Sequence, residues 1–153
     1  MASSAFGTFR YNVVDVARLI QSHRHLHSGA PGRKGLGHIT RSGVVMLCAA
    51  WEQYAEHLAL EAARVIAQRA AHPTELPVEV QKELSKHVKE SKNELRPLAL
   101  SGDGWRTVYI EHVKNKCDGI NTPKAGPLNE LFLKSIGLHE FSASWSCGAS
   151  TVN

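Results

Sequence analysis

The chain has 153 residues, with 18 Lys and Arg against 14 Asp and Glu, and 42% of its residues are hydrophobic. Such a chain can bury a core without disulfides or metal ions, and its modest positive charge is weak grounds for a nucleic-acid partner. No apolar run reaches the roughly 18 residues that a membrane span needs, and residues 1–6 do not resemble a secretory signal. We therefore expect a cytoplasmic protein with no membrane partner.

The cysteines Cys48, Cys117 and Cys147 are far apart in sequence and form no C-x-x-C pair. This spacing argues against a disulfide framework and against a thiolate zinc site. Cys48 falls within an apolar run, so we expect it to be a small core residue.

Apolar spacing predicts a first helix from Phe6 to about His23. Its apolar face comprises Phe6, Phe9, Val13, Ala17 and Ile20. The glycine-rich segment 28–37 predicts a flexible basic loop, because it lacks the pattern of a phosphate-binding loop. His23, His25 and His27 alternate before it, and since i and i+2 side chains diverge on a helix, a polar helix end is favoured over a metal site.

The clearest element is a helix from about Thr40 to Ala71, with Thr40 as the expected N-cap and His72-Pro73 as the stop. Its apolar stripe has steps of three and four residues and comprises Val44, Leu47, Trp51, Ala55, Leu58, Ala62 and Val65. A helix of this length would extend roughly 45 Å and could form the spine of a bundle. Glu52 and Glu56 lie beside the stripe, as a solvated edge, as partners for arginines, or as paired carboxylates that share a proton or a metal.

Three shorter helices are predicted in the rest of the chain. The first, from about Val78 to Ser91, has a narrow apolar stripe of Val80, Leu84 and Val88. The second, from about Gly104 to Lys116, has one side formed by Trp105, Val108, Tyr109, His112 and Val113. The third begins at Pro127, and Gly137 is its expected C-cap. No segment alternates as a strand does, so the sequence predicts an all-α, up-and-down helical bundle around one long central helix.

Two motifs resemble the HEPN family, in particular its RiboL-PSP type from prokaryotic defence systems. In the first, a stretch that begins at Thr40 contains a hydrophobic run and leads to Trp51, Glu52 and Tyr54. In the second, Asn-Thr-Pro at 121–123 is followed by Leu-Phe at 131–132 and Gly-Leu at 137–138. The resemblance extends from about residue 27 to residue 145. It implies one HEPN-like helical domain over residues 1–153 that forms a homodimer, uses no metal or cofactor, and has RNA or a neutralising protein as a partner.

Many members of that family are metal-independent endoribonucleases of defence or toxin–antitoxin systems. Their R-x4-6-H motif supplies an arginine for the scissile phosphate and a histidine for general acid–base catalysis. Here no Arg or His follows His139, so the motif is missing from its usual place near the start of the last helix. Among the bare matches elsewhere in the chain, Arg106 and His112 suit catalysis best because they lie on a predicted helix next to Asp103.

We therefore expect a HEPN-like protein that is either incomplete at its C-terminus or inactive, and its status as an enzyme stays open. Two alternatives remain. One is a non-catalytic HEPN-like module that dimerises or binds RNA or a nucleotide. The other is an unrelated helical protein-interaction domain.

Overall fold

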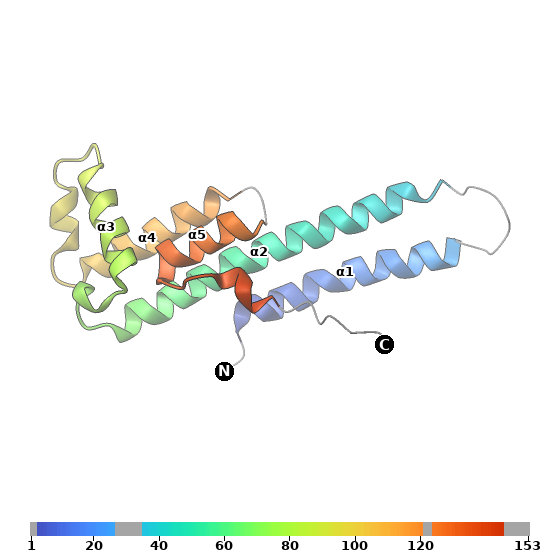
Figure 1. The fold of residues 1–153 in the computed structure, drawn as a ribbon, viewed down its shortest axis with the longest axis horizontal. Helices are drawn as coiled ribbons and strands as arrows, with labels where there is room; N and C mark the ends of the chain where they lie inside the picture. The colour runs from blue at the N-terminus through green and yellow to red at the C-terminus, as the bar shows by residue number, and fades with distance from the viewer. Residues whose placement is uncertain (1–2, 27–34, 121–123, 146–153) are drawn as a thin grey trace. The chain divides into compact units, whose positions relative to one another are not determined.

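The computed structural model describes residues 3–26, 35–120 and 124–145, and its α-helices are joined by turns and short 3-10 segments (Figure 1). The α-helices are α1 (Ser4–Leu26), α2 (Gly37–Arg69), α3 (Val78–Lys89), α4 (Gly104–Asp118) and α5 (Ala125–Ile136). Short 3-10 helices occupy Pro73–Glu75, Arg96–Leu100 and Phe141–Ser144. The described residues contain no strand, and α2, with 33 residues, is the longest helix. The predicted all-α bundle with one long helix is confirmed.

The chain divides into two compact units, Met1–Leu58 and Ala59–Asn153, and the division falls inside α2. None of the described helices is long and apolar enough to cross a membrane. Some predictions fall outside the described residues: the glycine-rich loop up to residue 34, the Asn-Thr-Pro segment at 121–123, His27 and Cys147.

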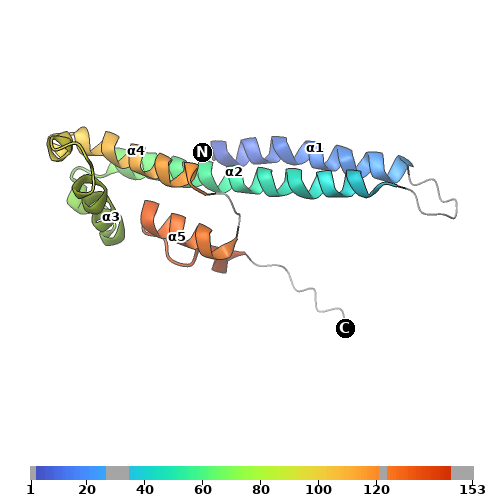
Figure 2. The ribbon, with the colours of Figure 1, turned by 90° about the horizontal axis from the view of Figure 1, so that it is seen from above.

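In the first unit, α1 and the first half of α2 lie side by side as a helical hairpin (Figures 1 and 2). The ring of Phe9 on α1 lies 6.1 Å from that of Trp51 and 5.0 Å from that of Tyr54. The predicted apolar face of α1 is wrong in part, because its buried residues are Ala5 and Val16. Within the first unit, α2 covers one side of α1, and bulky residues at the margins of the predicted face, such as Phe6 and Ile20, stay about half exposed.

The buried stripe of α2 also differs from the prediction. It consists of alanines: Ala50, Ala55, Ala59, Ala63 and Ala67, and Ala70 is buried directly after the helix ends at Arg69. The predicted stripe included Ala55 but then followed Leu58, Ala62 and Val65, and the side chain of Val65 is 41% exposed. Small residues let neighbouring elements approach a helix closely, whereas the prediction weighted residues by their hydrophobicity.

Two local predictions for α2 are wrong. The helix begins at Gly37, because the carbonyl of Leu36 already accepts from the N–H groups of Ile39 and Thr40. Thr40 is therefore inside the helix and is not its N-cap. Cys48 is exposed and is not a core residue.

The second unit has its core between α3, α4 and α5. Its largest fully buried side chains are Trp105, Tyr109, Phe132, Leu128, Val80 and Val113. The predicted apolar faces of α3 and α4 are buried as expected. Gly137 ends α5 in the left-handed conformation, with φ of 73° and its N–H donating to the carbonyl of Leu133, so its predicted role as C-cap is confirmed.

Candidate functional site

A cavity of about 270 Å³ opens between α3 and α4 around His112. The other residues that line it are Glu83, Lys86, His87, Glu90, Asn115 and Lys116. His112 is only 5% exposed, and its Nε2 has no hydrogen-bond partner among the described residues. The imidazole rings of His87 and His112 lie 4.9 Å apart between their centroids. One nitrogen of the buried imidazole is therefore closed to solvent and without a hydrogen-bond partner in the described structure.

The charges around this cavity balance one another. The carboxylate of Glu83 forms ion pairs with Lys116 Nζ at 2.9 Å and with Lys134 Nζ at 3.8 Å. The side chain of Glu83 is 16% exposed. Burial alone would raise the pKa of the Glu83 carboxyl, but the hydrogen bond and charge of Lys116 and the charge of Lys134 together bring this pKa below its usual value. The carboxylate is thus held ionised, and it offsets the positive lysines, which leaves the cavity without a strong preference for an anion.

His112 itself is held neutral. Burial lowers the pKa of its imidazole to about 4, with further lowering from His87 and Lys116, while Glu83 acts in the opposite direction. At neutral pH the ring can donate or accept one hydrogen bond at Nε2 but does not carry the positive charge that would attract a phosphate.

Arg106, the other predicted catalytic residue, lies on a different side of α4. Its Nε donates to Asp103 at 3.0 Å, its guanidinium donates to the carbonyl of Ala67, and it stacks 4.6 Å above the ring of Trp105. It lines a separate cavity of about 380 Å³ with residues of α2 and α4. Six helical positions rotate a side chain by about 240°, so one chain does not bring Arg106 and His112 together.

The residues Trp51, Glu52 and Tyr54, which carry the family resemblance, lie on α2 in the first unit. Trp51 and Tyr54 form an aromatic cluster with Phe9 and Phe6 of α1, and the Phe6 and Tyr54 rings lie 6.4 Å apart. Glu52 is partly exposed beside this cluster. These aromatic rings fix α1 against α2.

The hairpin also presents apolar surface that the sequence reasoning missed. Between its helices lies a cavity of about 370 Å³, lined on α1 by Val16, Leu19 and Ile20 and on α2 by residues that include Ile39, Val44 and Leu47. Val44 is 58% exposed and Val45 is 67% exposed. The signal for this surface was the unbroken apolar run from Val44 to Trp51. Eight consecutive apolar residues project from all sides of a helix and do not form one stripe.

Comparisons with known proteins give no relative: no family model, curated protein or solved structure matches this chain. Among the described residues, no group of three or more His, Cys, Asp or Glu side chains could hold a metal ion. Arguments about function therefore come from the chain's own surfaces.

Proposed function

We propose that this chain is a non-catalytic, HEPN-like helical module that forms a homodimer through the first half of α2. One observation carries the proposal: the helix is apolar on all sides from Val44 to Trp51, but α1 covers only one of these sides. A helix that is apolar all round is normally buried, so this segment needs a second neighbour.

The family resemblance is part of the same proposal. The all-helical fold and the packing of Trp51 and Tyr54 against α1 are compatible with a HEPN-like hairpin. The non-catalytic character is supported by the second unit, where His112 is buried and neutral and Arg106 lines a different cavity. A ribonuclease site would need both side chains beside one phosphate.

Self-association is tested by the molar mass in solution, measured by light scattering from micromolar to millimolar concentration. The wild-type chain should have twice the monomer mass, and Val45→Glu should reduce it to the monomer by placing a charge in the contact. Val78→Glu is the matched control, because Val78 is 62% exposed at the start of α3 and lies outside this surface. The proposal would be overturned if the wild-type chain stays monomeric, or if Val45→Glu has the same dimer mass as the wild type.

The non-catalytic part is tested with single-stranded RNA. We expect no cleavage by the wild-type dimer in the absence of metal ions. Cleavage that is lost in both His112→Ala and Arg106→Ala would show that the two residues act together, and would replace this proposal by the ribonuclease one.

A further inference from the structure

Four residues on one side of α2 are spaced symmetrically along the helix, so that their spacing is the same in either direction. Arg41, Val45, Cys48 and Glu52 follow one another in steps of four, three and four residues. At about 100° per residue, their side chains fall within a sector of about 60° on the helix surface. We call these four residues the outward face of α2.

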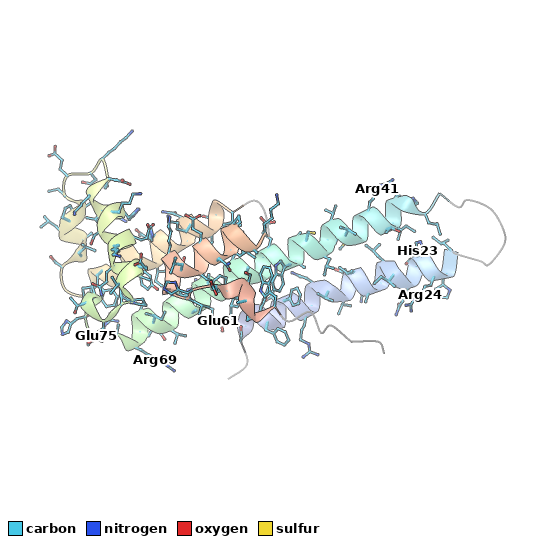
Figure 3. All side chains as sticks on the ribbon, viewed as in Figure 1. His23, Arg24, Arg41, Glu61, Arg69 and Glu75 are labelled. Carbon is cyan, nitrogen blue, oxygen red and sulfur yellow. The ribbon has the colours of Figure 1, made fainter. Side chains whose placement is uncertain are left out.

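This outward face points away from α1. Gln53 and Tyr54, which contact Asn12 and Phe9 of α1, project from the other side of the helix. Figure 3 shows Arg41 on the side of α2 that is turned away from α1. Arg41, Val45 and Cys48 are exposed, and Glu52 is partly exposed. The apolar centre of the face is therefore open to a neighbour.

The charges at the ends of the outward face are opposite in sign. Arg41 lies before the apolar centre and Glu52 lies after it. Neither side chain forms an ion pair or a hydrogen bond within the described part of the chain. A partner with the same pattern, running in the opposite direction, would supply the complementary charge at both ends.

We propose that two copies of α2 pack antiparallel on this face, about a two-fold axis that passes between the two helices at the level of Met46 and Leu47. With this axis, Arg41 of one copy lies opposite Glu52 of the other, and Val45 lies opposite Cys48. Each pair occurs twice, as an interface between identical surfaces requires. This inference rests on the proposed homodimer and specifies its geometry.

The antiparallel direction follows from charge and from side-chain size. Two parallel copies in register would place Arg41 beside Arg41 and Glu52 beside Glu52, which is repulsive. The small side chain of Cys48 lies opposite Val45 at both central contacts, so the helix axes can approach to about 8 Å.

Charge reversal tests the direction by dissociation constants measured by sedimentation. Arg41→Glu and Glu52→Arg should each weaken the homodimer roughly tenfold or more, since both ion pairs become repulsive. The double variant Arg41→Glu/Glu52→Arg should regain the wild-type affinity, because both pairs are restored with their signs exchanged. A mixture of the two single variants should form a heterodimer in preference to either homodimer. Arg69→Glu, at the far end of α2, is the control and should leave the affinity unchanged.

The outcomes separate the two proposals. If the wild-type chain is monomeric, the homodimer falls, this geometry falls with it, and the outward face belongs to a partner of another sequence. The second outcome is a dimer that Val45→Glu dissociates, but whose affinity does not change in Arg41→Glu or in Glu52→Arg. In that case the homodimer stands and the antiparallel geometry is overturned. If both single variants are weak but the double variant does not recover, the pairing of Arg41 with Glu52 is also overturned.

Discussion

Gly137 is a single residue on which the end of α5 depends. Its φ of 73° lies in the left-handed region, and an added Cβ would overlap the ring of Pro77. Gly137→Ala should therefore lower the free energy of unfolding by about 2 kcal/mol or more, measured by urea denaturation. Gly102→Ala separates the two causes, because Gly102 has a φ of 54° but nothing within 4 Å of the added atom. It should cost only about 1 kcal/mol, and equal losses for both variants would contradict the predicted clash with Pro77.

His112 should make stability depend on pH. The folded protein protonates this imidazole only near pH 4, because burial lowers its pKa, whereas an unfolded chain does so near pH 6.5. Between these values the unfolded state binds more protons, so the free energy of unfolding should fall as the pH drops from 6.5 to 4, by about 3 kcal/mol at most. Above pH 6.5 the contribution of His112 should be constant.

The variant His112→Leu removes the titrating group, and its unfolding free energy should change less over this pH range than that of the wild-type protein. Ser135→Ala is the matched control, because Ser135 Oγ is also buried and without a hydrogen-bond partner in the described structure but does not titrate. Urea denaturation at several pH values gives both results. A pH dependence in His112→Leu as steep as in the wild type would show that other groups cause it.

At the scale of the elements, Glu83 joins three helices. It lies on α3 and pairs with Lys116 of α4 and Lys134 of α5. Glu83→Gln should lower the free energy of unfolding at neutral pH by about 1–3 kcal/mol, since two lysines lose a largely buried counter-charge. Glu79→Gln is the control on the same helix: its pair with Lys82 is largely solvent-exposed, and its loss should cost no more than about 0.5 kcal/mol. Similar losses would contradict a special role for Glu83.

The sequence predicted the helices well because most of them bury a single face against a neighbour. On α4 the side formed by Trp105, Tyr109 and Val113 is buried as its spacing indicated. The prediction failed on α2, where Cys48 was expected in the core but is exposed. Spacing shows which residues are apolar, but it does not show how many sides of a helix have neighbours.

The candidate site was less predictable than the fold. His112 was predicted as a catalytic residue from its spacing to Arg106, but its neighbours His87 and Glu83 come from another helix, and no local motif connects them. The spacing of Arg106 and His112 satisfied a sequence pattern, while helix geometry placed the two side chains on different cavities. Such patterns specify separation along the chain, whereas catalysis requires proximity in space.

At the scale of the whole molecule, the proposed dimer links stability to protein concentration. If folding and association are coupled, a tenfold rise in concentration stabilises the dimer by about 1.4 kcal/mol. For two chains of 153 residues, this should raise the midpoint of thermal unfolding by roughly 2 °C per tenfold change. Calorimetry or circular dichroism over a hundredfold range of concentration would measure the shift.

The same scan on Val45→Glu distinguishes association from other causes of stability. A monomer unfolds at a temperature that does not depend on concentration, so the midpoint of this variant should stay constant, and Val78→Glu should follow the wild type. A wild-type midpoint that is also constant would mean that unfolding is not coupled to association, which would contradict the proposed dimer. A shift in the wild type and in Val78→Glu, but not in Val45→Glu, would show that contact between two chains through α2 stabilises the fold.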